Sequence, residues 1–462
     1  MSSETTNDFL ANNKPHVLMI TNHGFHDWQI RSGLKDTGGQ NHYVNALSDT
    51  LVDLGYKVTI MNRGGFADPV TAKIREGIHA KSKDARIFYL CGGADQFIAK
   101  ENLTLEILDE EASFACRQLA KEQSQVNLII SHYWDGAVVA GLIKKKLALQ
   151  TKHIWVPHSL GALKKENFKS KSAEIIQAMH FEERINFEKN VLKTVDMVGS
   201  TSGDITRVLK QEYQYTPQIF LPPCIDTNKV YPTTLREDSP LFSFLRQQDP
   251  IADPLAPGKR CLLEISRTDV TKRKDVVIMA FAEIIKKHPE TWLLLTLSPD
   301  NNTLFDELDQ LINRLGIRQR VVYLGMIPRQ LIPELYALCT VYCSPSEMEG
   351  FGMSVQEACA CQRPVVTSQL VPFVTEFLMK NSHKEVIQTA QGACSVTWGE
   401  GGAVVLAGEI GGFAHAIDRL LTDPNLYHDM ADKAYAVTIP YFTWPQITKI
   451  MLSQIGLAIP NE

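Results

Sequence analysis

Two glutamates on either side of a glycine turn, Glu349 and Glu357, are the residues whose type and spacing point most directly to chemistry. The intervening Gly350-Phe351-Gly352 follows a short apolar run and precedes a helical pattern, which predicts strand, turn, helix and strand over residues 344–368. Glycines let the backbone pass close to a ligand, and a helix start offers free N–H groups and a positive dipole to phosphate. Carboxylates on both sides can accept hydrogen bonds from sugar and ribose hydroxyls. The segment therefore suits a nucleotide sugar, although two glutamates at this spacing also occur on ordinary solvated helices.

Two cations, Arg267 and Lys272, follow the first predicted strand in the second half of the chain. An arginine fork and a lysine point charge can hold a diphosphate. They can also stabilise the negative charge that develops on the diphosphate when its bond to a sugar breaks. The run Lys272-Arg273-Lys274 is equally compatible with a solvated loop. Since the sequence has no Asp-x-Asp motif, the cations and the N–H groups near Gly352 and Met353 are expected to act in place of a metal ion.

A second glycine pair, Gly38-Gly39, stands with Gln40 immediately before a predicted helix in the first half of the chain. Paired glycines at such a position expose backbone N–H groups to an anion or a sugar. The same pair also serves tight turns, so this signal is weak on its own.

Strand and helix signals alternate along both halves of the chain, which is typical of parallel, doubly wound α/β domains. Pro222-Pro223 and the irregular stretch over 231–258 predict a hinge and linker between them. The predicted domains cover residues 15–235 and 258–430, and a final helical segment covers 431–462. Ligands of open parallel sheets bind beyond the carboxyl ends of the strands, so two facing domains would place a site in the cleft between them. The predicted strands are 17–20, 58–61, 87–90, 126–130 and 154–156 in the first half, and 261–265, 292–297, 321–324, 341–343 and 365–366 in the second.

Composition excludes several classes of protein. A length of 462 residues allows roughly two to three domains, and a formal net charge of −5 gives no basic surface for nucleic acid. The polar first residues and the lack of a long apolar run predict a cytoplasmic protein without a membrane span. The nine cysteines form no CxxC pair, so they are interpreted as small buried side chains.

Several motifs in a fixed order resemble the retaining glycosyltransferases of family 4, which have two Rossmann-like domains (the GT-B fold). The resemblance covers nearly the whole chain and is strongest to the branch of the sucrose-phosphate and mannosylfructose-phosphate synthases. It rests on Asp36-Thr37-Gly38-Gly39-Gln40, Cys91-Gly92-Gly93, Lys100-Glu101, His132-Tyr133-Trp134-Asp135, His158-Ser159-Leu160-Gly161, Arg184-Ile185-x-x-Glu188, the pairs Arg267/Lys272 and Glu349/Glu357, and Tyr441-Phe442-Thr443-Trp444.

This resemblance implies transfer of a hexose from a nucleoside diphosphate, such as UDP-glucose or GDP-mannose, to a small anionic acceptor. It also implies that the last helix crosses back to the first domain, and that no further cofactor is required. The implied catalytic residues are Glu349, Arg267, Lys272 and His158; the implied donor-binding residues are Gly38, Gly39, Gly352, Met353 and Glu357; and the implied acceptor-binding residues are Gln40, Lys100, Lys164 and Arg184.

The chain departs from the family pattern after residue 366, where Val371-Pro372-Phe373 leads into an unusual segment through Trp398. This departure leaves the donor sugar and the acceptor open. Glycerate, a glycosylglycerate or another small polyol could take the place of a sugar phosphate. A nucleotide-sugar epimerase or hydrolase of the same fold is a rival interpretation, and a nucleotide-sugar sensor without turnover is another. The presence of Glu349, Arg267 and Lys272 argues against the sensor.

Overall fold

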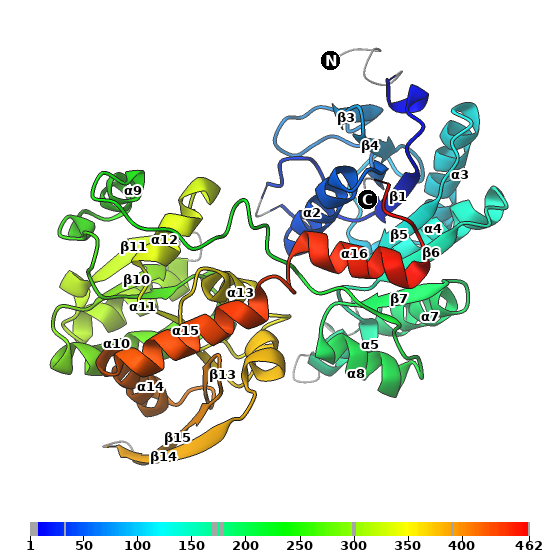
Figure 1. Ribbon diagram of the computed structural model, residues 1–462. Helices are drawn as coiled ribbons and strands as arrows, with labels where there is room; N and C mark the ends of the chain where they lie inside the picture. The colour runs from blue at the N-terminus through cyan, green and yellow to red at the C-terminus, as the bar shows by residue number, and fades with distance from the viewer. Residues whose placement is uncertain are drawn as a thin grey trace. The chain divides into compact units, whose positions relative to one another are not determined.

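The computed structural model describes residues 8–31, 34–167, 179–297, 302–389 and 392–460, with Glu174 and Gln177 in addition. The chain divides into two compact units, drawn in Figure 1. Unit 1 combines Met1–Pro223 with Trp444–Glu462, and unit 2 is Cys224–Thr443. No helix within the described ranges is long and apolar enough to cross a membrane.

Within the described residues, unit 1 contains an 8-stranded sheet of order β3-β4-β2-β1-β5-β6-β7-β8. All its pairings are parallel except that of β3 with β4. Every residue of the central strand β1 is buried, as expected for a parallel strand covered on both faces. The strands are β1 (His16–Thr21), β2 (Lys57–Arg63), β3 (Ile78–Ser82), β4 (Ala85–Leu90), β5 (Leu128–His132), β6 (Lys152–Val156), β7 (Met197–Ser200) and β8 (Ile219–Phe220).

The helices of unit 1 follow the strands in the alternation that the sequence predicts. They are α2 (Gly39–Asp53), η1 (Lys100–Asn102), α3 (Leu105–Lys121), α4 (Tyr133–Lys146), α5 (Gly161–Asn167), α7 (Phe181–Leu192), α8 (Gly203–Glu212) and, from the end of the chain, α16 (Trp444–Ile455). The prediction that the last helix returns to the first domain is confirmed. Trp444 of α16 packs edge-on against Tyr43 of α2, with ring centroids 4.7 Å apart.

Unit 2 contains, within its described residues, a second 8-stranded sheet of order β11-β10-β9-β12-β13-β16-β15-β14. Its five predicted strands are confirmed. Strand β16 adds a further parallel strand beside β13, and β15 and β14 extend that edge as antiparallel strands. The hairpin of β14 and β15 projects from the rest of this unit in Figure 1. The strands are β9 (Cys261–Glu264), β10 (Trp292–Thr296), β11 (Val321–Leu324), β12 (Val341–Ser344), β13 (Val365–Ser368), β14 (His383–Thr389), β15 (Gly392–Trp398) and β16 (Ala403–Val405).

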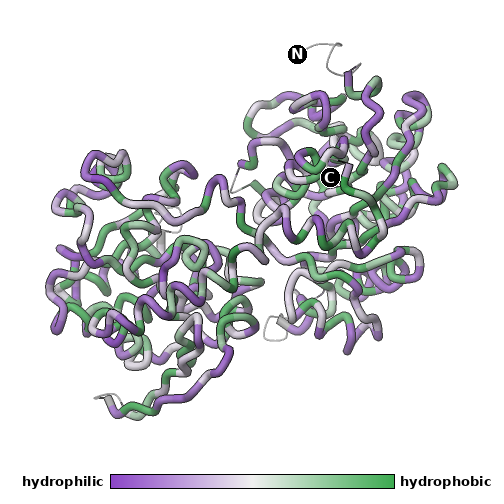
Figure 2. Tube along the Cα trace, viewed as in Figure 1, coloured by the Kyte–Doolittle hydropathy of each residue, from purple (hydrophilic) through white to green (hydrophobic). Residues whose placement is uncertain are grey.

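The helices of unit 2 pack on this sheet around an apolar core of its strands with α10, α11 and α14. In Figure 2, hydrophobic stretches run through the sheet of each unit and hydrophilic stretches run along the outer helices and loops. The helical segments are α9 (Pro240–Gln248), η2 (Pro250–Ala252), η3 (Val270–Lys272), α10 (Lys274–Lys287), α11 (Asn302–Arg314), η4 (Arg318–Arg320), η5 (Arg329–Leu331), α12 (Ile332–Leu338), α13 (Met353–Ala360), the π-helical η6 (Val374–Leu378), α14 (Ile410–Thr422) and α15 (Pro424–Thr438).

The stretch interpreted as a linker, 231–258, is instead part of unit 2. Its helix α9 buries Leu241, Phe242 and Leu245. Asp249 at the end of α9 then accepts hydrogen bonds from the backbone of Tyr323 and from Arg318, at 3.1 and 2.9 Å. This segment packs through one apolar face of a short helix. The helix is hard to recognise in the sequence because Pro, Asp and Ser residues surround it.

Each sheet reverses its strand order at one place, and this positions the candidate residues. In unit 1 the reversal lies between β1 and β5, and in unit 2 it lies between β9 and β12. Loops that follow neighbouring strands at such a switch point leave the sheet in opposite directions and form the usual ligand site of an open α/β sheet. The glycine loop with Asp36 follows β1, the loop with Arg267 and Lys272 follows β9, and the turn with Glu349 follows β12.

Candidate active site

The structure brings together two of the predicted catalytic residues of unit 2. Lys272 Nζ lies 2.6 Å from Glu349 Oε1 and 3.0 Å from the carbonyl oxygen of Met348. Lys272 itself is 8% exposed, so its ammonium is held in a fixed place at the carboxyl edge of the sheet. A third contact, 3.4 Å to Ser346 Oγ, was not predicted from the sequence. A partly desolvated ammonium beside a carboxylate can serve as a preorganised donor to a developing anion.

Helix α13 begins at Met353, directly after the glycine turn, as the sequence predicts. Gly352 has φ of 102°, which disfavours any residue with a Cβ. A Cβ on Gly352 would also lie 2.7 Å from Cγ1 of Val371. The unusual segment after β13 thus packs directly on this turn, and the backbone of Phe373 donates a 2.8 Å hydrogen bond to the carbonyl of Phe351. The segment therefore fixes the N-terminus of α13, where free N–H groups can meet an anion.

Replacing Gly352 with alanine should lower the free energy of unfolding of this unit by about 1–3 kcal/mol, the usual cost of a residue held in a sparsely populated backbone region. The same change should weaken nucleoside-diphosphate binding, because the turn must shift away from Val371. Gly350→Ala is the matched control, since a Cβ there meets nothing within 4 Å. Chemical denaturation and calorimetric titration with nucleoside diphosphates measure the two effects. Equal behaviour of the two alanine variants would contradict this account of the turn.

Glu357 lies on α13 and accepts a 3.0 Å hydrogen bond from the hydroxyl of Tyr336 on α12. Burial raises the pKa of this carboxyl, and the Tyr336 hydrogen bond and the charge of Arg329 oppose the rise. Tyr336 also lies 2.9 Å from the carbonyl oxygen of Ser354, so it ties the first turn of α13 to Glu357. Tyr336 was missed by sequence reasoning, because its pairing with α13 spans two separate elements.

Arg267 is exposed in the loop after β9 and forms no ion pair with any described residue. The loop itself is held by a buried network that the sequence did not reveal. Lys274 is 2% exposed, pairs with Glu264, and donates to Ser266 Oγ at 2.9 Å and Thr296 Oγ1 at 3.1 Å. Lys274, for which a solvated loop was one of two interpretations, is thus a structural residue that anchors the start of the loop that carries Arg267.

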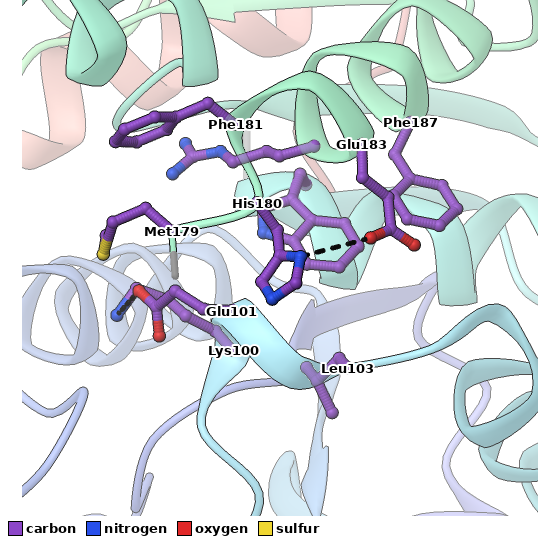
Figure 3. Close-up of a pocket in the computed structure, with 10 residues that line it drawn as sticks. Lys100, Glu101, Leu103, Met179, His180, Phe181, Glu183 and Phe187 are labelled. Atoms are coloured by element: carbon purple, nitrogen blue, oxygen red, sulfur yellow. Dashed lines mark ion pairs between the residues drawn. The ribbon is translucent and has the colours of Figure 1, made fainter. Parts of the chain in front are cut away.

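The three predicted acceptor cations of unit 1 gather around one side chain, Tyr133, the first residue of α4. The guanidinium carbon of Arg184 lies 4.6 Å from the centre of the Tyr133 ring, and Lys164 Nζ lies 5.9 Å from it. Lys100 lies close enough to lower the pKa of the same tyrosine. Lys100 and Arg184 also line a pocket shown in Figure 3, whose wall includes Trp134, Met179, Phe181 and Phe187.

Arg184 on α7 is held from several directions. Its Nε donates to Glu188 Oε1 at 2.8 Å, its Nη1 to the Tyr133 hydroxyl at 3.2 Å, and its Nη2 to the carbonyl of Ser159 at 2.7 Å. Glu188 is fully buried and also accepts from the backbone N–H of Gly161 and the hydroxyl of Tyr213. In the sequence, Glu188 is recognisable only as part of a motif, without a role of its own. The structure shows that it orients the arginine.

Lys100 begins the short helix η1 and pairs with Asp36 of the glycine loop and with Glu101, whose Oε1 lies 3.1 Å from Nζ. The backbone N–H of Lys100 also donates to Asp36 Oδ2 at 3.3 Å. Asp36 was not named as a functional residue from the sequence. Its carboxylate joins the loop of Gly38-Gly39 to the segment of Lys100-Glu101, so these two motifs form one structure.

Tyr133 should ionise far below the usual range for a phenol. Burial opposes ionisation, but the positive charges of Arg184, Lys164, His23 and Lys100 outweigh it and lower the pKa of Tyr133 from 10.0 to about 7. We expect the ultraviolet absorbance of one phenolate to appear around neutral pH and to be absent from Tyr133→Phe. Because this pKa lies below that of an unfolded tyrosine, the ionisation should add stability as the pH rises from about 7 toward 10. If the wild-type protein titrated like the variant, the predicted effect of these positive charges on the pKa of Tyr133 would be wrong.

The remaining predicted residues of unit 1 lie at the carboxyl edge of the same sheet. Gly38 and Gly39 stand at the start of α2, where an added Cβ would meet nothing within 4 Å at either position. Gln40 Nε2 donates to Thr21 Oγ1, 2.9 Å away, at the end of β1. His158 Nε2 lies 3.0 Å from His132 Nδ1, and burial lowers the pKa of His158 to about 3, so its ring is neutral. Within the described residues, no group of three His, Cys, Asp or Glu side chains could hold a metal ion.

Comparison with known proteins identifies two family models along the chain. The model described as Glycosyltransferase Family 4 matches residues 37–229, and the model described as Glycosyl transferases group 1 matches residues 246–437. The first lies in unit 1 and the second in unit 2.

Relatives and solved structures agree with these matches. Mannosylfructose-phosphate synthase from Agrobacterium fabrum is 27% identical over 77% of this chain and 76% of its own length. D-inositol 3-phosphate glycosyltransferase 2 from Catenulispora acidiphila is 24% identical over 87% of this chain and 86% of its own. The structure of sucrose-phosphate synthase from Thermosynechococcus elongatus matches with a TM-score of 0.70 at 23% identity and covers 96% of this chain and 98% of that one. The chain therefore has the GT-B fold and belongs to glycosyltransferase family 4, whose members transfer a hexosyl group from a nucleotide sugar.

Proposed function

We propose that this protein transfers a hexosyl group, with retention of anomeric configuration, from a nucleoside-diphosphate hexose to a phosphorylated small acceptor. The observation that carries the proposal is the convergence of Arg184, Lys164 and Lys100 around Tyr133 in unit 1. Cations that converge from three separate segments can clamp an anionic group and so orient an attacking hydroxyl. The names of the relatives support this choice, since mannosylfructose-phosphate synthase and D-inositol 3-phosphate glycosyltransferase both refer to phosphorylated compounds.

The cluster keeps donors available for a phosphate even though two of its cations are already paired. The protein contacts of Arg184 use its Nε and one N–H on each of Nη1 and Nη2. A guanidinium has five N–H donors, so one remains on each Nη. Lys164 forms no ion pair with any residue that the structure describes. The two N–H groups of Arg184 and the ammonium of Lys164 would therefore hold the phosphate, and Asp36 and Glu101 would keep Lys100 in its place beside them.

On the donor side, Lys272 and the N–H groups at the start of α13 would hold the diphosphate, and exposed Arg267 can turn toward it. As the bond between the anomeric carbon and the diphosphate breaks, the electron pair stays on the diphosphate oxygen, where these donors stabilise it. The acceptor oxygen forms the new bond to the anomeric carbon on the same face, and its proton passes to the departing diphosphate. Glu349 accepts from Lys272 and would also accept from a sugar hydroxyl.

The two glutamates should give different kinetic signatures. Glu357→Gln is expected to weaken nucleoside-diphosphate binding, because this carboxylate is assigned to the ribose, and Glu349→Gln is expected mainly to lower kcat, because it is assigned to the transferred sugar. Calorimetry with the nucleoside diphosphate and initial-rate kinetics separate the two. Equal losses of nucleotide affinity would show that the roles are wrongly assigned.

An acceptor screen tests the proposal as a whole. Wild-type protein is incubated with UDP-glucose, GDP-mannose or an ADP-hexose and with fructose 6-phosphate, an inositol phosphate, glycerate or fructose, and the anomeric configuration of any product is read by NMR. We expect transfer to a phosphorylated acceptor with retention. Efficient transfer to neutral fructose that is unaffected by Arg184→Ala, or formation of an epimer of the donor without any acceptor, would overturn it.

A further inference from the structure

A buried histidine–carboxylate pair lies beside the cation cluster. His23 Nδ1 is 2.9 Å from Asp135 Oδ1 and 3.1 Å from Asp135 Oδ2. Asp135 is fully buried, and His23 is 5% exposed. A carboxylate that accepts from one imidazole nitrogen fixes the ring and directs the other nitrogen outward.

The second nitrogen of His23 has no partner in the described part of the chain. Some ring nitrogens of unit 1, such as Nε2 of His132, are both buried and unpaired. His23 Nε2 is unpaired but is not one of these buried atoms, so solvent can reach it. Among the buried histidines of this sheet, His16 is bonded through both nitrogens, to Ser124 and to Thr59. His23 is therefore held firmly at one end and free to bind a ligand at the other.

The topology places this pair at the switch point of the sheet. His23 follows β1 and Asp135 lies in the first turn of α4 after β5, and these strands pair side by side with Thr21 opposite His132. The His23 ring packs edge-on against Tyr133, with centroids 4.4 Å apart. A Cβ on the next residue, Gly24, would lie 2.2 Å from the carbonyl oxygen of Asp36, so the glycine loop closes directly over this position.

We propose that His23 is an acceptor-contacting residue whose Nε2 hydrogen-bonds a hydroxyl oxygen of the phosphorylated acceptor, and that Asp135 is the positioning residue that holds it. The inference rests on the proposed function. It assigns His23 to a hydroxyl group of an acceptor whose phosphate lies at Arg184 and Lys164. One phosphate clamp leaves a small sugar or polyol free to rotate about its phosphate. A second, fixed contact removes that freedom and selects one hydroxyl for attack.

The electrostatic surroundings of His23 favour a hydrogen-bond donor. Burial alone would lower its pKa, but the charge and hydrogen bond of Asp135 outweigh burial and raise it, while the charge of Lys100 acts in the opposite direction. The raised pKa favours the ring that carries N–H on both nitrogens, in which Nε2 can donate to an acceptor oxygen while Nδ1 donates to Asp135.

Binding measurements with two kinds of probe, sugar or polyol phosphates and inorganic phosphate, separate the hydroxyl contact from the phosphate clamp. Fructose 6-phosphate and inositol 3-phosphate carry alcohol hydroxyls on carbon, which inorganic phosphate lacks. We expect His23→Phe, which keeps a ring against Tyr133, to weaken the binding of the sugar or polyol phosphate by about 10- to 100-fold, the value of one hydrogen bond from a charged donor. It should leave inorganic phosphate unchanged, whereas Arg184→Ala should weaken both. His23→Gln keeps an N–H donor and should recover part of the loss.

Asp135→Asn tests the positioning role. If Asp135 acts through His23, Asp135→Asn alone should cost less than His23→Phe, and the double variant should bind sugar phosphate no worse than His23→Phe. Melting temperatures report folding separately, with His153→Asn as the control. His153 is fully buried and bonded through Nε2 to Ser131 at 2.7 Å, so its loss should affect stability and not ligand selection.

Each outcome decides a different claim. A His23→Phe variant that binds both probes like the wild type, or loses both equally, would overturn the role of His23 and leave the proposed function standing. Additive losses in the double variant would overturn the positioning role of Asp135. A wild-type protein that binds none of the three phosphate compounds would overturn the proposed function and, with it, this inference.

Discussion

Replacing Lys272 with methionine should lower kcat by about 100- to 1,000-fold, the usual effect of removing one preorganised donor to a developing anion. The structure makes this expectation specific, because the Lys272 ammonium is held by Glu349 at 2.6 Å and by the carbonyl of Met348 at 3.0 Å. Little reorganisation is then needed when charge appears on the leaving diphosphate. Initial rates at saturating donor and acceptor measure the effect, and chemical denaturation should show a much smaller change in stability.

Lys286 provides a matched control for Lys272. It lies on α10 of the same unit and is exposed. Among the described residues its one ion-pair partner is Glu283, three residues earlier, so Lys286→Met should leave both rate and stability nearly unchanged. Lys272→Arg keeps the charge but alters its placement and should fall between the two. Since Lys272, Arg267 and the start of α13 supply the positive charge in this scheme, EDTA should not slow the wild-type enzyme. A Lys272→Met variant with near-normal turnover, or a strict requirement for a divalent metal, would refute the assignment.

The parallel core of the fold was predictable because its strands are buried on both faces. Such strands appear in sequence as short unbroken apolar runs, and those at β1, β9 and β10 were found within one or two residues of their observed ends. Strands β3, β7, β8 and β16 and the hairpin of β14 and β15 were missed. The residues of β3 and β14 are mostly exposed or half-buried, so their sequences carry no apolar run. These segments form strands because they hydrogen-bond to a neighbouring strand, and their own residue pattern does not show this.

The candidate site was predictable as a set of residue types and much less as a set of contacts. Lys272 and Glu349 were both named, but the ion pair between them joins loops after two different strands. Asp36, Glu188 and Tyr133 were quoted only within motifs. Their importance comes from contacts between segments far apart in the chain, such as the link from Asp36 to Lys100, and a local pattern of residues does not encode such contacts.

Replacing Arg184 with methionine should raise KM for a phosphorylated acceptor by about 100-fold, because it removes two charge-assisted hydrogen bonds to the phosphate. Donor binding should not change, since every described contact of Arg184 lies within unit 1. Steady-state kinetics with varied acceptor, and calorimetry with the nucleoside diphosphate, measure the two quantities. Stability should also fall, by about 3–5 kcal/mol, because the change leaves the buried carboxylate of Glu188 without its cation.

This loss of stability could imitate a loss of function, and the double variant Arg184→Met with Glu188→Gln separates the two. It removes both charges of a pair in which Glu188 is fully buried, so most of the stability should return. Acceptor affinity should remain low, because no guanidinium is left to meet the phosphate. Recovery of acceptor KM together with stability would mean that Arg184 acts only as a structural partner of Glu188. The phosphate would then have to be held by Lys164 and Lys100, which Lys164→Met would test in the same assay.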